Sequence, residues 1–169
     1  MNRIPLFLLW VYLLWPSLLY GQPRFEARTI VAGLRYGYQL AAVDLTGDGC
    51  KDLIAVDERA EELAWFENPG WERRVMARST PRPINVDCWD YDGDGTPECL
   101  LGYNFGTDPR KSMGNLVLLD AGTNVREPWR QTEIDRIPTL HRLRWIDPAG
   151  KGKKILLAAP MVGTNAAAP

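Results

Sequence analysis

The densest group of side chains able to do chemistry lies between residues 90 and 98. This stretch reads DYDGDGTPE and holds four carboxylates and two glycines. Acids at positions 1, 3 and 5 followed by Gly at 6 are typical of a calcium loop, because calcium takes about six to eight oxygen ligands at roughly 2.3–2.6 Å. The predicted ligands are four side chains and one backbone carbonyl: Asp90, Asp92, Asp94, Glu98 and the Thr96 carbonyl.

A weaker copy of this loop lies upstream and reads DLTGDGCKD from Asp44 to Asp52. Its predicted ligands are three carboxylates, one hydroxyl and one backbone carbonyl: Asp44, Asp48, Asp52, Thr46 and the Cys50 carbonyl. One carboxylate fewer predicts weaker binding. A third copy, DPAGKGK from Asp147, has Ala149 and Lys151 where acids are wanted, so we expect no metal there. The alternative for all three loops is a set of Asp/Gly-rich turns without metal.

The residues around the loops favour strands over the helices of an EF-hand. An EF-hand needs a bidentate Glu at position 12, whereas Ala55 and Leu101 occupy that position in the first and second loops. Short apolar runs separated by turn residues predict an all-β chain. The predicted strands are 24–31, 40–43, 53–56, 62–67, 71–76, 86–89, 99–103, 115–120, 129–134, 141–146 and 155–159.

These strands recur in groups of four around each acidic loop. A repeat of this length with four strands per unit predicts the blades of a β-propeller, which closes with about four to eight blades. We predict blades over residues 38–80, 84–136 and 140–169, the last one incomplete, with the segment 24–31 as one leading strand. The propeller region would span 23–169. On this interpretation the sequence is a fragment of about 2.5 blades of a longer protein.

The first 22 residues differ from the rest. A charged start at Arg3, an apolar run and Gly21 predict a secretory signal peptide. Pro5 and Pro16 leave about ten uninterrupted apolar residues, short of the ~20 that a membrane span needs, so membrane attachment is expected only if this segment stays uncleaved. We therefore predict a secreted, periplasmic or extracellular protein. The net charge of −1 gives no reason to expect nucleic acid as a partner.

The cysteines are Cys50, Cys88 and Cys99. Cys88 and Cys99 flank the central loop, so they either pair across neighbouring strands or serve as two small half-buried apolar residues. The sequence leaves both alternatives open.

The loops resemble a known repeat. Asp-x-(Asp/Thr)-Gly-Asp-Gly-x-x-(Asp/Glu) between two strands is similar to the FG-GAP/VCBS repeats of integrin-like β-propellers, and Phe105-Gly106 and 158–160 loosely match the first motif. The resemblance covers about residues 25–169. It implies structural calcium in the loops and a ring that serves adhesion or carbohydrate binding.

A narrower resemblance involves residues 64–69, AWFENP, and 139–142, TLHR. They are similar to the propeller part of aldos-2-ulose dehydratase and its relatives, which use metal-bound histidines. This resemblance makes His141 a candidate ligand or general base, although Tyr38 and Ile84 occupy the matching places in the other blades. The alternative is a strand-end histidine with a satisfied hydrogen bond.

Three functions follow from these observations. The first is an exported, calcium-stabilised propeller that binds a glycan or protein ligand. The second is the propeller of a sugar-processing lyase, with His141 in its centre. The third is a structural repeat without activity of its own, so the sequence leaves open whether the chain is an enzyme.

Overall fold

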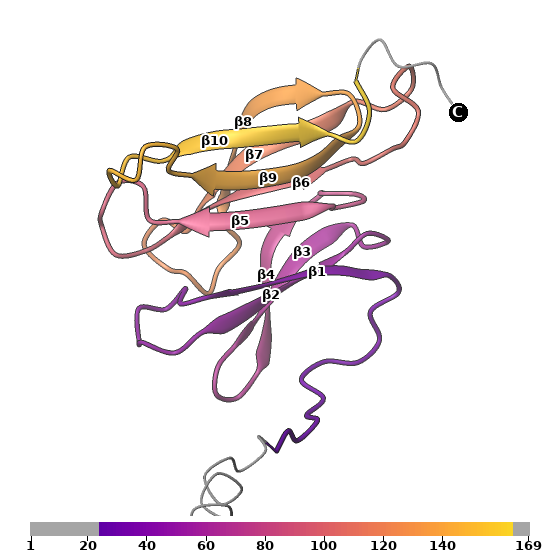
Figure 1. Cartoon of the computed structure of the whole chain (residues 1–169). Helices are drawn as coiled ribbons and strands as arrows, with labels where there is room; N and C mark the ends of the chain where they lie inside the picture. Colours follow the sequence, from indigo (N-terminus) through magenta and orange to yellow (C-terminus); the bar gives the residue numbers. More distant parts are fainter. Residues whose placement is uncertain (1–23, 164–169) are drawn as a thin grey trace, which may run out of the picture. The chain divides into compact units, whose positions relative to one another are not determined.

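The computed structural model describes residues 24–163. The predicted signal peptide, residues 1–22, lies outside this range. The described residues form ten strands and no helix (Figure 1). The strands are β1 Gly37–Val43, β2 Asp52–Asp57, β3 Glu62–Glu67, β4 Glu72–Arg78, β5 Asn85–Trp89, β6 Glu98–Tyr103, β7 Gly114–Asp120, β8 Arg130–Ile137, β9 Leu140–Ile146 and β10 Ile155–Pro160. Accordingly, no helix in the described part is long and apolar enough to cross a membrane.

The strands pair in chain order into antiparallel sheets. Two sheets have four strands, β1-β2-β3-β4 and β5-β6-β7-β8, and a third contains β9 and β10. This confirms the predicted all-β class and the grouping of strands in fours. The sheets do not close on one another within the described residues, so the structure shows stacked meanders without establishing a propeller ring.

The predicted leading strand over residues 24–31 is wrong. Residues 24–30 form a unit separate from the rest of the chain, and the whole segment 24–31 has no strand structure. Its alternating pattern is a genuine strand signal, but a strand exists only when its N–H and C=O groups pair with a neighbour. No described strand pairs with this segment, and residues 24–29 are exposed.

Within the unit from Val31 onwards, the middle sheet packs on both of its faces. One core joins the first two sheets and contains Ile54 and Trp65 on one side and Leu101 and Trp129 on the other. A backbone hydrogen bond from Trp129 N–H to Met76 C=O, 2.8 Å long, joins the same two sheets. A buried residue such as Trp65 contributes about 2–3 kcal/mol relative to its exposed state, which favours this stacking.

The second core joins the other face of the middle sheet to β9 and β10. It contains Leu100 and Leu116 against Leu140 and Leu143, all of them buried. Burial on both faces explains why β6 reads as a continuous apolar run and not as an alternating pattern.

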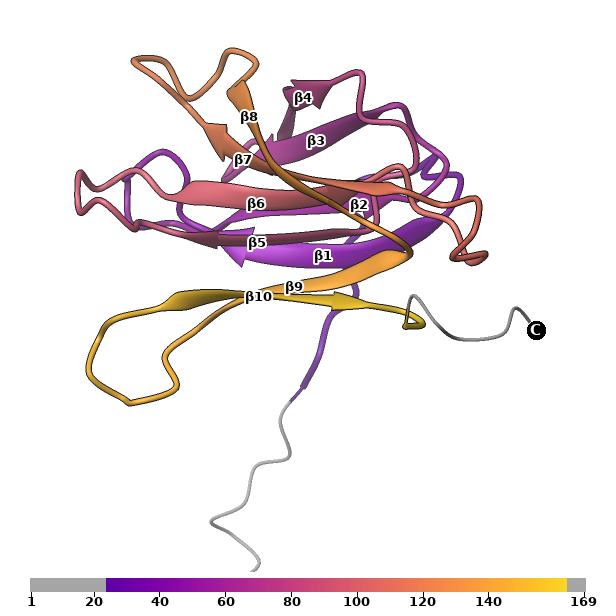
Figure 2. The same ribbon diagram turned by 90° about the horizontal axis from the view of Figure 1, so that it is seen from above.

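The first strands of the three sheets lie side by side, with β4 and β8 on the far side (Figure 2). Polar side chains connect these inner strands. Gln39 of β1 accepts a hydrogen bond from the Val86 N–H and donates one to the Val86 carbonyl, both 2.8 Å long. Asn85 of β5 accepts from the Leu143 N–H of β9 at 2.6 Å. Each bond satisfies a backbone group on a strand edge that faces another sheet.

Candidate metal centre

The turn between β5 and β6 is built by Asp90 and two glycines. One carboxylate oxygen of Asp90 accepts from the Gly93 N–H at 2.7 Å, and the other accepts from the Gly95 N–H at 3.0 Å. Gly93 and Gly95 have φ of 81° and 95°, a region that a residue with a Cβ seldom adopts. The first Asp and the two glycines therefore fix the backbone path of the turn.

The same turn occurs twice more, at the corresponding end of the other two sheets (Figure 1). Asp44 accepts from Gly47 and Gly49, which have φ of 74° and 85°. Asp147 accepts from the Gly152 N–H at 2.6 Å, and Gly152 also has positive φ. The repeat seen in the sequence is thus a repeat of backbone geometry, and it persists where the other acids are replaced.

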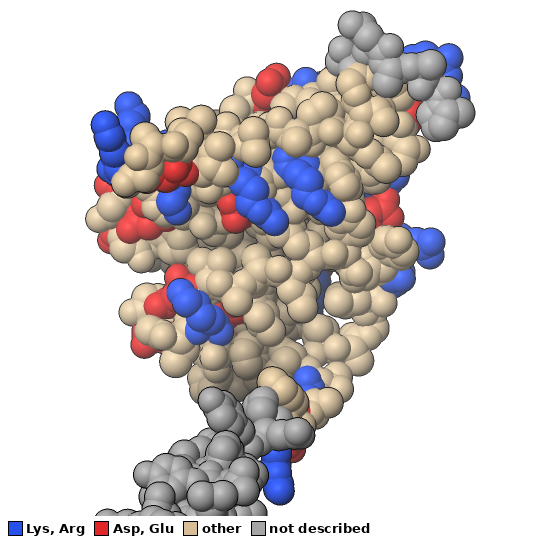
Figure 3. All heavy atoms as spheres, in the orientation of Figure 1, with Lys and Arg blue, Asp and Glu red and all other residues tan. Residues whose placement is uncertain are grey.

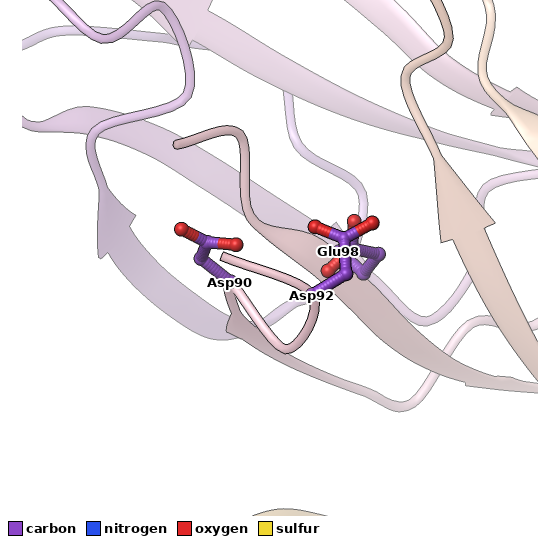
Figure 4. A group of neighbouring side chains, drawn as sticks. All are labelled: Asp90, Asp92 and Glu98. Carbon is purple, nitrogen blue, oxygen red and sulfur yellow. The ribbon is translucent and has the colours of Figure 1, made fainter. Parts of the chain in front are cut away.

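Only the central turn gathers three acidic side chains into one group among the described residues. Oxygens of Asp90, Asp92 and Glu98 lie within 4.8 Å of one another, and Figure 4 shows the side chains around the turn. Two oxygens bound to one calcium ion at about 2.3–2.6 Å lie at most roughly 5 Å apart. The spacing and the all-oxygen donor set fit a hard divalent cation, and these three residues would hold it.

Glu98 is the most buried member of the group, with 7% of its surface exposed. Burial raises the pKa of its carboxyl group, and the charges of Asp92 and Asp94 raise it further, against the opposing Tyr91 N–H hydrogen bond. A cation would neutralise these crowded charges and reverse the local electrostatic penalty. Without a bound cation, the repulsion among these carboxylates therefore destabilises the folded state.

Asp94, a further predicted ligand of this turn, is not part of the group. Asp94 is exposed, and its carboxylate accepts from the Thr96 N–H at 2.7 Å, so it caps the turn. Thr96 makes this contact through its N–H, and the ligand role of its carbonyl stays a prediction.

The first turn differs from the second at its last acid. Asp52 is fully buried, and both of its oxygens accept backbone N–H groups, from Leu45 at 3.0 Å and from Asn68 at 2.9 Å. Glu98 uses one oxygen in the corresponding contact, with the Tyr91 N–H at 3.1 Å. Asp52 is thus held in the framework and is not grouped with the other acids of its turn.

The remaining predicted ligands of the first turn, Asp48, Cys50 and Thr46, have different surroundings. Asp48 accepts from the Cys50 N–H at 2.8 Å, and Cys50 is an exposed free cysteine. The hydroxyl of Thr46, at the position of Asp92, is buried without a hydrogen-bond partner. That orphaned oxygen fits a ligand role at a weaker site, but the carboxylates around it are not brought together.

Cys88 and Cys99 form a disulfide, which settles the alternative left open by the sequence. They face each other across β5 and β6, directly before and after the acidic turn. The corresponding register pair beside the first turn is Ala42 and Leu53. The central turn is therefore the one closed by a covalent bridge at its base.

His141 lies near the start of β9, at the end opposite to the Asp147 turn. Its contacts come from residues far away in the sequence. Its Nε2 atom and the Tyr38 hydroxyl are 2.6 Å apart, and its ring is 5.5 Å from that of Phe105. Burial lowers the pKa of His141, and the charge of Arg142 lowers it further, which favours the neutral ring. The described residues hold no second histidine, since the sequence has one.

The contacts of two sets of residues were not predicted from the sequence. One is the polar inner-strand residues Gln39, Asn85 and Asp87; the last accepts from the Trp145 N–H at 2.6 Å. Polar residues inside apolar strands were a usable signal for these contacts. The other is Asn68, whose N–H bond to Asp52 joins residues from different turns and leaves no local pattern.

No protein-family model matches the chain. No curated protein matches it with statistical significance either. The assignment of a function therefore depends on the geometry described above.

Proposed function

We propose that the chain is an exported, calcium-stabilised β-propeller module of the FG-GAP/VCBS type with a binding or adhesive role. The observation that carries the proposal is the same Asp/Gly turn at equivalent positions on three stacked sheets, one copy having an acidic triad. Calcium in that turn would neutralise the triad of Asp90, Asp92 and Glu98 and fix the connection between β5 and β6. Its role is structural.

The propeller part of the proposal is supported by the stacking order. The two four-stranded meanders and the β9–β10 sheet pack face to face in chain order, and their first strands lie side by side, as the inner strands of propeller blades do. A ring needs about four or more blades, so the proposal requires blades beyond the ones described. Export is supported by the Cys88–Cys99 disulfide, because disulfides persist mainly in oxidising compartments.

The binding role is favoured over catalysis because the two groups with candidate chemistry, His141 and the acidic triad, do not lie around a shared site. His141 is engaged with Tyr38, and the acidic triad lies at the opposite end of the strands.

Thermal melting with calcium or a chelator tests the structural role of the metal. Calcium at about 100 times its dissociation constant stabilises a site-containing domain by roughly 2.7 kcal/mol. For a domain of this size we expect the melting temperature to rise by roughly 5–10 °C. Asp92→Asn should lose most of this rise, whereas Asp94→Asn, the same charge change outside the triad, should keep it. Equal melting curves with calcium and chelator would refute the proposal.

A further inference from the structure

At the end of the strands opposite to the acidic turns, four aromatic rings form a continuous band. They come from the segment before β1, the start of β1, the start of β9 and the loop after β6: Tyr36, Tyr38, His141 and Phe105. Successive ring centroids are 6.4, 6.0 and 5.5 Å apart. Tyr36 is half exposed, so the band reaches the surface.

Hydrogen bonds hold the centre of the band in place. The Tyr38 hydroxyl contacts His141 Nε2 at 2.6 Å and accepts from Arg142 Nη2 at 3.2 Å. The Arg142 guanidinium also lies over the Tyr38 ring, 5.2 Å from its centroid. A surface whose side chains are fixed before binding loses less conformational entropy when a ligand arrives.

Two arginines beside the band have no acidic partner among the described residues. Arg142 and Arg144 are exposed on alternate positions of β9, so they project from the same face of the strand. Arg144 is held by bonds to the Leu143 carbonyl at 2.8 Å and to Asn85 Oδ1 at 3.4 Å. Figure 3 shows basic side chains side by side over β9.

These two arginines differ from Arg82, a third arginine near the band. Arg82, next to Phe105, is neutralised by Glu58 at 3.0 Å. The charges of Arg142 and Arg144 are not neutralised in this way, and a guanidinium binds carboxylate or sulfate oxygens with two parallel hydrogen bonds. An oxyanion is therefore the complementary ligand group at this place.

We propose that this surface binds an acidic polysaccharide, with a carboxylate or sulfate on Arg142 and Arg144 and sugar rings against the aromatic band. Sugars present both an apolar C–H face and hydroxyls, which match aromatic rings beside the Tyr38 hydroxyl. The inference rests on the proposed binding role and names the class of its ligand.

Titration calorimetry of the full chain with polygalacturonate, dextran sulfate and uncharged dextran tests the proposal and distinguishes carboxylate from sulfate. We expect one of the polyanions to bind and dextran not to bind. Arg142→Gln/Arg144→Gln should weaken binding by at least about tenfold, as expected when charge-assisted hydrogen bonds are lost. The matched control is Lys151→Gln/Lys153→Gln, which removes the same charge at the other end of the strands and should leave affinity within about twofold.

Equal weakening by the two double variants, or binding of neither polyanion, would overturn the proposal. Tyr36→Ala adds a second criterion, since loss of a stacking ring should weaken binding without changing net charge. The calcium-dependent rise in melting temperature is measured on the same samples. If the rise occurs but no polyanion binds, only the ligand assignment is refuted. If a polyanion binds but the rise does not occur, only the structural role of calcium is refuted.

Discussion

Asp90 and Glu98 belong to the same acidic group but serve different purposes. Asp90 accepts two backbone N–H groups and has counterparts in Asp44 and Asp147, one of which lies in a turn without further acids. Glu98 is nearly buried and has one protein hydrogen bond. The first residue therefore shapes the turn, and the second provides a charge that only a cation would balance.

We expect Asp90→Ala and Asp92→Asn to separate these purposes. Asp90→Ala removes two backbone contacts and should lower the free energy of unfolding by about 1–2 kcal/mol with or without calcium. Asp92→Asn should lower it only when calcium is present. Urea unfolding with calcium and with chelator measures both. Asp147→Ala is the control, because it should behave as Asp90→Ala does in a turn without the triad.

Glu98→Gln should have different effects on stability in chelator and in calcium. In chelator the variant removes a buried charge near Asp92 and Asp94, so the free energy of unfolding at pH 7 should stay the same or rise by up to about 1 kcal/mol. In calcium the variant should lose most of the metal-dependent stabilisation. A variant that loses stability equally in both conditions would show that Glu98 acts as a framework residue.

At the scale of elements, the disulfide and the turn it closes form one unit. Cys88 and Cys99 join β5 to β6 directly beside the triad, whereas the first turn has Ala42 and Leu53 at that position. The disulfide limits how far β5 and β6 can separate beside the turn. It therefore preorganises the acidic side chains for binding one ion.

Cys88→Ser/Cys99→Ser should therefore weaken calcium binding at the central turn by about threefold to tenfold. It should also destabilise the fold by roughly 2–3 kcal/mol through the unfolded chain. Calorimetry of calcium binding measures the first effect and urea unfolding the second. Cys50→Ser is the control and should change neither. Unchanged calcium affinity in the double variant would mean that the backbone hydrogen bonds between β5 and β6 hold the turn in its binding conformation without the disulfide.

Asp57 ties the segment before β1 to the end of β2. Burial by itself would raise the pKa of Asp57, but hydrogen bonds from the Arg35, Arg59 and Tyr36 N–H groups lower it below its usual 3.8. A lowered folded-state pKa gives stability that is present above pH 3.8 and lost as the pH falls through the folded value.

We expect Asp57→Asn to be less stable than the wild type at pH 7 by about 1–2 kcal/mol, and the difference to shrink below about pH 3. Urea unfolding across pH 2.5–7 in chelator measures this. A difference that stays constant with pH would show that the Asp57 charge has no part in the contact.

At the scale of the molecule, the stack of sheets follows from local signals to a large extent. Alternating residues and turn signals predicted the strands of all three sheets, and the spacing of Asp and Gly predicted the turns. These features are encoded within a few residues, where sterics and hydrogen bonding act directly.

What depended on distant residues was predicted less well. The segment 24–31 has a strand pattern but no neighbour to pair with. Asp52 accepts a second N–H from Asn68, which lies outside its turn, and the contacts of Gln39 and Asn85 on the inner strands join different sheets. These partners of Asp52, Gln39 and Asn85 lie 16 to 59 residues away along the chain, outside any local window of sequence.

Direct calcium titration of the full chain, followed by calorimetry, tests the central claim most directly. The account predicts a strong site that Asp92→Asn abolishes and Asp94→Asn preserves, and a weaker site in the first turn that Thr46→Val reduces. Lys151→Gln should leave both unchanged. Absence of calcium binding, or binding that Asp92→Asn leaves intact, would contradict the account.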